Sequence, residues 1–121
     1  MKNSGFQKAL ERVRAICLAL PEAVEVEAWG HPTFRAGKKM FAGLGESNPG
    51  GPTLGLKVGF DRQDELLQDP RFFPTPYAAH QGWVSLRLDA GTDWEEVKGL
   101  LREAYRQVAL KRMLKALESI R

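Results

Sequence analysis

Residues 29–42 constrain the fold more than any other part of this 121-residue chain. They combine aromatic side chains, glycines and bases, and they show almost no helical periodicity. Residues 33–36 and 39–44 have the composition of two short strands, which Gly37 and Lys38 join. Nothing in this segment has the spacing of a catalytic or metal-binding motif. The sequence therefore predicts a β-hairpin here.

Further strands are predicted where apolar and polar residues alternate, because successive side chains of a strand point to opposite faces. The alternation covers residues 24–28, which suits a half-buried first strand, and residues 53–60 and 83–88. The inward face of the last two segments is predicted to consist of Leu54, Leu56, Val58, Phe60, Val84, Leu86 and Leu88. Their outward face then presents Lys57, Trp83, Ser85 and Arg87. Residues 69–77 are predicted to be irregular, but their aromatic side chains favour packing against the domain.

Apolar residues three and four positions apart predict a first amphipathic helix over residues 4–20, with Ser4 as its N-cap and Pro21 at its end. The single cysteine, Cys17, lies on the apolar stripe of this helix and cannot form an internal disulfide, so a core position is expected. A short helix is expected at residues 62–68.

A long closing helix is predicted over residues 93–120, capped by either Thr92 or Asp93. Its apolar stripe changes phase after Val108. A bend near residues 107–110 explains that change better than one straight helix does.

Together these elements predict a single α+β domain over residues 1–121, in the order α-β-β-β-β-α-β-α. Hairpin-type connections favour a mainly antiparallel sheet of about five strands, with the N- and C-terminal helices packed on one face. The core is predicted to include Leu10, Val13, Leu20, Leu56, Val58, Leu86, Leu101 and Val108.

The composition is that of a globular protein, with 43% hydrophobic and 27% charged residues. The longest uncharged apolar run, residues 15–20, is far shorter than the roughly 20 residues that span a bilayer. The N-terminus lacks the apolar region of a secretory signal. We therefore expect a cytoplasmic monomer that does not associate with membranes.

The net charge of +3 is modest, but its distribution is uneven. Residues 98–121 contain seven bases and two acids, whereas residues 61–69 contain four acids and one base. A surface that faces an anionic partner has such an asymmetry, and so does an ordinary lysine-rich solubilising surface.

Several motifs follow one another in a specific order: Trp29-Gly30-His31-Pro32-Thr33-Phe34-Arg35, Gly37-Lys38-Lys39-Met40-Phe41-Ala42, Leu54-Gly55-Leu56-Lys57, Phe73-Pro74-Thr75-Pro76-Tyr77, Gly82-Trp83-Val84 and the helix around Tyr105. On these motifs the chain resembles the MmcQ/YjbR family of small bacterial proteins, from Leu20 to about Leu114. The family usually shows Ser-Tyr where this chain has Ala104-Tyr105, so no role is expected for a serine hydroxyl there. The resemblance implies a compact α+β fold with a central antiparallel sheet. It also implies DNA binding, the usual description of the family, and it supplies no catalytic residues.

Two sets of residues are candidates for weak, largely non-specific contact with nucleic acid. On the strands, Lys57 is flanked by Gly55 and Gly59, which leave its ammonium group open to a phosphate. Trp83 lies on the same side of its strand as Arg87, and an exposed indole there is expected to stack on a nucleobase. On the closing helix, three bases four residues apart form a row that tracks a phosphate backbone. The full candidate set is Arg35, Lys38, Lys39, Lys57, Trp83, Arg87, Lys98, Arg102 and Arg106.

Each set also has a structural interpretation. For the strand set, the loop at residues 72–77 would bury Trp83, and Lys57 would simply be solvated. For the helical set, the row of bases would be a solvated helix face on which Glu95 and Glu103 pair with residues three and four positions away. The alternative function is a protein- or small-ligand-binding module, with a groove lined by the aromatic residues Trp29, Phe72, Phe73, Tyr77 and Trp83.

Neither a metal, a cofactor nor an enzymatic reaction is expected. His31 and His80 have no partner at ligand spacing, and no nucleophile or phosphate-binding loop has the required context. Glu25 and Glu27 share one face of a strand, where two carboxylates can raise a pKa. The solvated side of an edge strand is the preferred interpretation of that pair.

Overall fold

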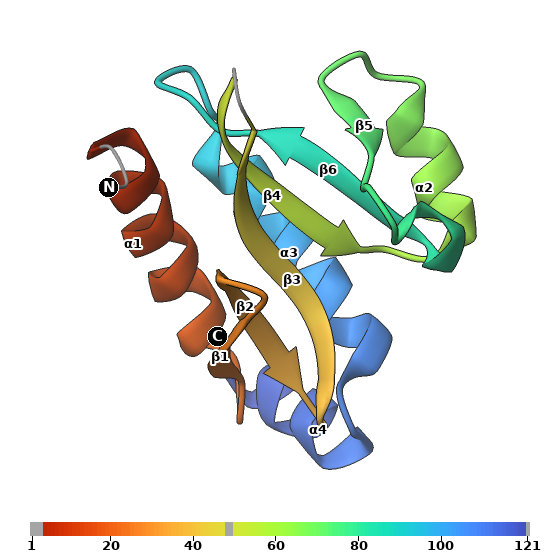
Figure 1. Cartoon of the computed structure of the whole chain (residues 1–121). Coiled ribbons are helices and arrows are strands. Elements are labelled where there is room, and N and C mark those ends of the chain that lie inside the picture. Colours follow the sequence, from red (N-terminus) through yellow and green to blue (C-terminus); the bar gives the residue numbers. More distant parts are fainter. Residues whose placement is uncertain (1–3, 48–49, 121) are drawn as a thin grey trace.

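The computed structural model describes residues 4–47 and 50–120 of the chain. In chain order the elements are α1 (Ser4–Leu18), β1 (Val24–Ala28), β2 (His31–Ala36), β3 (Lys39–Ser47), β4 (Gly51–Lys57), α2 (Phe60–Leu67), β5 (Phe72–Pro74), the 3-10 turn η1 (Ala79–Gln81), β6 (Trp83–Arg87), α3 (Trp94–Val108) and α4 (Lys111–Ser119). Within these residues the strands form one antiparallel sheet in the order β1-β2-β3-β4-β6-β5 (Figure 1). The α+β class and the antiparallel sheet are as the sequence predicted.

The helices α1 and α3 pack on one face of the sheet, as predicted for the terminal helices (Figure 1). The core lies between them and the strands, and all eight predicted core residues are buried there. Tyr105 of α3 is fully buried, and its hydroxyl donates a hydrogen bond of 2.7 Å to the carbonyl of Pro21. Cys17 is also buried, and burial raises the pKa of its thiol. No helix among the described residues is long and apolar enough to cross a membrane.

The strand predicted over residues 53–60 ends earlier, and the inward position predicted for Phe60 is wrong. The strand β4 stops at Lys57, and Phe60 opens α2 with 61% of its surface exposed. The cause is a turn at Gly59, whose φ of +89° suits glycine. The backbone N–H groups of Val58 and Gly59 both donate to the carbonyl of Gly82, which holds the turn in place.

Two further elements depart from the expected pattern. Residues 72–74, predicted to be irregular, form the edge strand β5, so the sheet has one strand more than the five expected. Its three residues end in Pro74, which keeps this edge short. The closing helix is divided at Ala109 and Leu110, whose ψ angles are extended. The bend predicted near residues 107–110 is thereby confirmed.

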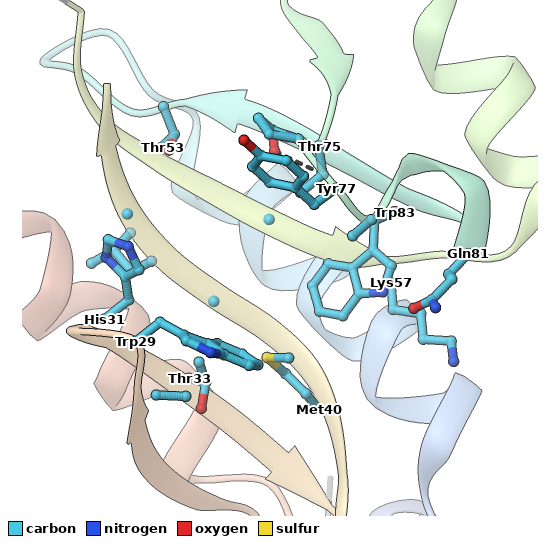
Figure 2. Close-up of a pocket in the computed structure, with 18 of the residues that line it drawn as sticks. Trp29, His31, Thr33, Met40, Thr53, Lys57, Thr75, Tyr77, Gln81 and Trp83 are labelled. Carbon is cyan, nitrogen blue, oxygen red and sulfur yellow. Dashed lines mark hydrogen bonds between the residues drawn. The ribbon is translucent and has the colours of Figure 1, made fainter. Parts of the chain in front are cut away.

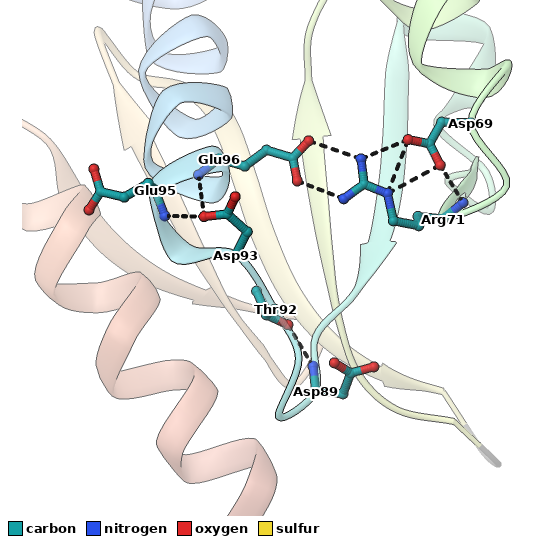
Figure 3. A network of polar contacts seen from close by, with 7 residues as sticks. All are labelled: Asp69, Arg71, Asp89, Thr92, Asp93, Glu95 and Glu96. Carbon is teal, nitrogen blue, oxygen red and sulfur yellow. Dashed lines mark hydrogen bonds and ion pairs between the residues drawn. The ribbon is translucent and has the colours of Figure 1, made fainter.

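Side chains fix the start of α3 (Figure 3). The carboxylate of Asp93 accepts hydrogen bonds from the backbone N–H groups of Glu95 and Glu96, so Asp93 is the N-cap. Thr92 instead accepts a bond of 2.7 Å from the N–H of Asp89. The cap predicted for Ser4 lies outside the side chains that the structure describes.

Candidate functional site

The face of the sheet opposite α1 and α3 contains a groove of about 1040 Å³. Side chains from β2, β3, β4, β5 and β6 line it, together with the β1–β2 turn and the segment between β5 and β6 (Figure 2). The residues that carry aromatic rings or charge along it are Trp29, His31, Arg35, Lys39, Glu46, Lys57, Phe73, Tyr77 and Trp83. Most of the other lining residues are glycines, alanines and hydroxyl-bearing side chains.

Glycines form the floor of the groove. Gly43 and Gly45 of β3 and Gly55 of β4 lie at the positions that alternate with buried leucines, and Gly43 is paired with Gly55 across the strands. A Cβ atom built on Gly43 would lie 3.7 Å from the Thr33 methyl group, in ordinary contact. The absence of side chains therefore hollows this face and exposes flat backbone to a ligand.

Two exposed aromatic residues stand at the rims of the groove. Trp29, in the β1–β2 turn, is 83% exposed, and Tyr77, after β5, is 99% exposed. Figure 2 shows them on opposite sides of the groove. Both have positive φ angles, +53° for Trp29 and +65° for Tyr77. Bulky side chains rarely adopt that backbone region, and such outliers gather at functional sites.

Three of the predicted bases line the groove. Arg35 comes from β2, Lys39 from the start of β3 and Lys57 from the end of β4. Arg35 and Lys57 are half-buried, whereas Lys39 is exposed. Among the described lining residues the one acid is Glu46, so the charge of the groove is positive.

Trp83 also lines the groove, but it is not the exposed platform that was predicted. It is only 7% exposed, and its ring lies against Gly55, where a Cβ atom would be 3.6 Å from the indole; the segment between β5 and β6 also lines the groove. The side chain of Gln63 binds that segment to β6 by donating to the carbonyls of Ala79 and Trp83. The indole is therefore buried, and the prediction of an exposed stacking platform is wrong.

Two other strand and turn candidates lie outside the groove. The Arg87 guanidinium lies 5.1 Å from the centre of the Phe73 ring and is exposed. Lys38 is exposed in the β2–β3 turn, at a φ of +72°. Neither residue is among those that line the groove.

The three helical candidates lie on the other side of the sheet. Lys98, Arg102 and Arg106 belong to α3, whose buried stripe packs against β3 and β4 from the face opposite the groove (Figure 1). The nine predicted residues therefore do not form one basic face, because the sheet separates the helical set from the strand set. Glu103 binds Arg62 of α2, at 2.9 Å, and not a neighbour on its own helix.

The solvated position predicted for the acidic pair on β1 is correct for Glu27, which is exposed on this edge strand, but not for Glu25. Glu25 faces α1 and binds Arg14 through two bonds of 2.6 and 2.8 Å. The hydrogen bonds from Arg14 lower the pKa of this carboxyl, so the two carboxylates do not raise it. Val24 and Val26, on the other face of β1, are exposed as well. Within the described residues no group of three or more His, Cys, Asp or Glu side chains could hold a metal ion.

Comparison with known proteins identifies the family. The family model named YjbR matches residues 18–107. The chain belongs to the YjbR family. Protein DR2400 of Deinococcus radiodurans, which has a DUF419 domain, is 26% identical, with a TM-score of 0.72 over 90% of this chain and 87% of that one. A protein from Pseudomonas syringae, 15% identical, has the same fold, with a TM-score of 0.67 over 84% of this chain and 97% of that one. No curated protein matches.

Sequence reasoning missed the glycine floor, although its signal was present. Alternation places Gly55 on the outward side of its strand. Gly43 and Gly45 are two residues apart, so they share one side of the neighbouring strand. Three glycines on one face predict a hollow only when two strands are known to be neighbours. That pairing came from the structure.

Proposed function

We propose that this YjbR-family protein is a non-enzymatic nucleic-acid-binding domain that takes a single strand in the groove. The observation that carries the proposal is the convergence of three bases and two exposed aromatic rims on one concave face. Bases neutralise the phosphates of a strand without reading its sequence, and aromatic rings stack on any nucleobase. Binding of this kind is weak and largely independent of sequence.

Single strands fit this face better than duplex does. The rings of Trp29 and Tyr77 would have to reach the faces of nucleobases, which are covered in a stacked duplex. The helical row at Lys98, Arg102 and Arg106 offers phosphate contacts on the other side of the sheet, outside the groove and away from its two exposed rings. The order of affinity expected is therefore single strand above duplex.

Fluorescence anisotropy with labelled single-stranded and duplex oligonucleotides tests the proposal. If Arg35, Lys39 and Lys57 each neutralise one phosphate, affinity for a single strand should fall roughly 20-fold between 50 and 200 mM salt. The change Lys57→Gln should weaken binding and flatten the salt dependence. The matched control is Arg102→Gln on α3, which should leave affinity within about twofold. No binding by the wild-type protein at about 50 mM salt, or equal losses in both variants, would contradict the proposal.

A small planar ligand is the second candidate for the same groove. Its volume of about 1040 Å³ lies at the upper end of the range for small-molecule sites. Small aromatic compounds that stabilise the protein in thermal unfolding, while oligonucleotides neither bind nor compete, would favour this candidate.

A further inference from the structure

Arg35 of β2 has a side-chain N–H group that the fold leaves unsatisfied. Its Nε atom is buried from solvent and has no hydrogen-bond acceptor. A buried donor without an acceptor costs free energy, and the cost is larger when the group is charged. An orphaned donor of this kind in a folded protein needs a physical explanation.

Other arginines show how this chain usually satisfies a guanidinium group. Four bind a carboxylate through two nitrogens, in the pairs Arg14–Glu25, Arg62–Glu103, Arg71–Glu96 and Arg112–Glu22. Two others lie over an aromatic ring, Arg12 over Trp94 and Arg87 over Phe73, and Arg71 also lies over Phe72. Arg35 lines the groove and has neither kind of partner among the described residues.

The surroundings of Arg35 explain why no counter-ion reaches it. Its cross-strand neighbours are Val24 on β1 and Met40 on β3, whose side chains offer no acceptor stronger than a thioether sulfur. Lys39 and Lys57 line the same groove and add positive charge. The described residues therefore supply no acceptor for the Arg35 Nε atom, and an anion from outside the chain would fit that position.

We propose that Arg35 anchors a phosphate group of the ligand in the groove. This inference rests on the proposed function and names the chemistry that the groove selects. A guanidinium presents paired N–H donors that match phosphate oxygens, and the nearby lysines favour a phosphate over a singly charged carboxylate. Trp29 lies in the turn that precedes β2, Arg35 lies near the end of that strand, and both residues line the groove. A phosphate at Arg35 and a planar base at Trp29 can thus be held along the same side of the groove.

The change Arg35→Met tests this role, with Arg14→Met as the matched control. Without ligand, Arg35→Met should have an unchanged or higher Tm, because an apolar side chain of similar length replaces a half-buried guanidinium whose buried Nε atom has no acceptor. Its affinity for a labelled oligothymidylate should fall at least about tenfold. Arg14→Met should lower the Tm without changing the affinity, because it leaves Glu25 without its partner. Its Tm should fall by about 3 °C, while its affinity stays within about twofold.

Oligothymidylates with and without a 5′-phosphate show which phosphate Arg35 binds. A loss confined to 5′-phosphorylated strands assigns Arg35 to a terminal phosphate, and an equal loss assigns it to an internal phosphodiester. Both results support the anchor. Wild-type affinity in Arg35→Met would overturn it, and so would a ligand-free Tm below that of the wild type, which would show a structural role.

Inorganic phosphate separates this inference from the proposed function. If the wild-type protein binds no oligonucleotide, the proposed function fails, and phosphate alone then decides the role of Arg35. Millimolar phosphate should raise the Tm of the wild type more than that of Arg35→Met. The comparison between the two proteins is needed because phosphate stabilises proteins in general. Equal increases would overturn the inference.

Discussion

Trp29 has a strained backbone conformation that costs stability at the rim of the groove. Trp29 and Gly30 are the two central residues of the β1–β2 hairpin, between the paired residues Ala28 and His31. Their φ angles of +53° and +78° define a type I′ turn, in which asparagine or glycine is preferred at the first central position. An exposed tryptophan gains little burial there, so local preference does not explain its presence.

The change Trp29→Asn should therefore stabilise the protein and weaken its binding. Removing the strain should raise the free energy of unfolding by roughly 1 kcal/mol, which is a few degrees in Tm. Losing the stacking ring should reduce affinity for single strands by roughly fivefold or more, since stacking contributes about 1–3 kcal/mol per base. Thermal unfolding and anisotropy measure the two effects.

Lys38→Asn is the control for this prediction. Lys38 has a φ of +72° in the β2–β3 turn and does not line the groove. It should gain stability by the same mechanism with little change in affinity. A Trp29→Asn protein that binds as tightly as the wild type would remove Trp29 from the proposed site.

At the scale of elements, ion pairs and close packing join the helices to the sheet. Arg14 and Glu25 connect α1 to β1, and Arg71 connects the segment before β5 to α3 by binding both Asp69 and Glu96 (Figure 3). The β2–β3 turn packs against the α3–α4 junction, where a Cβ atom on Gly37 would lie 3.1 Å from Leu110 Cγ.

The Arg14–Glu25 pair should make stability depend on pH on the acid side. Hydrogen bonding from Arg14 lowers the pKa of Glu25 in the folded state. The unfolded chain therefore binds more protons, and stability rises with pH over that range. The contribution is complete above the unfolded value of about 4.3 and disappears as the pH falls through the lower folded value. Urea midpoints from pH 6 to pH 3 should fall less steeply in Arg14→Met than in the wild type; identical profiles would contradict this account.

The tight packing at Gly37 predicts a specific difference between two glycine substitutions. Gly37 and Gly30 both have positive φ, but a Cβ atom on Gly30 would meet nothing within 4 Å. The change Gly30→Ala should therefore cost only the backbone strain, about 1 kcal/mol. Gly37→Ala should cost roughly 2–3 kcal/mol, because Leu110 and the Val108 carbonyl must also move. Denaturant unfolding of both variants measures the difference, and equal costs would show that the junction is not tightly packed.

The whole molecule has one covered and one open sheet face, and the open face holds the groove. Its shape depends on glycines from two neighbouring strands, while its charge and rings come from five strands and two connecting segments. Filling the floor is the most direct test of this arrangement, because it leaves every charged and aromatic residue of the groove in place.

The change Gly43→Val should obstruct the floor of the groove without weakening the fold. A Cβ at Gly43 makes only ordinary contacts, and valine favours strands where glycine does not, so stability should be unchanged or up to about 1 kcal/mol higher. Affinity for single strands should fall at least about tenfold. Melting curves and anisotropy report both quantities, and a variant that binds normally would place the ligand elsewhere on the molecule.

Local patterns in the sequence determined the elements and the core. Alternation and helical spacing are properties of neighbouring residues, so the predicted strands, the break near Val108 and the buried Leu56 and Leu101 could be found without a structure. Phe60 was misplaced because alternation continued in the sequence after Gly59 had turned the backbone away. The motifs that resemble the YjbR family pointed to the family that the comparisons identify.

Only the tertiary structure decided which of these residues share a face. Strand pairing placed Gly43 beside Gly55, and Arg35 between two apolar neighbours. The packing of α3 put Arg102 on the far side of the sheet from Lys57. Charge and hydrophobicity along a chain do not reveal such relations, because they depend on contacts between residues that are distant in sequence. The sequence by itself therefore determined the elements and the core, and the pairing of the strands decided the groove.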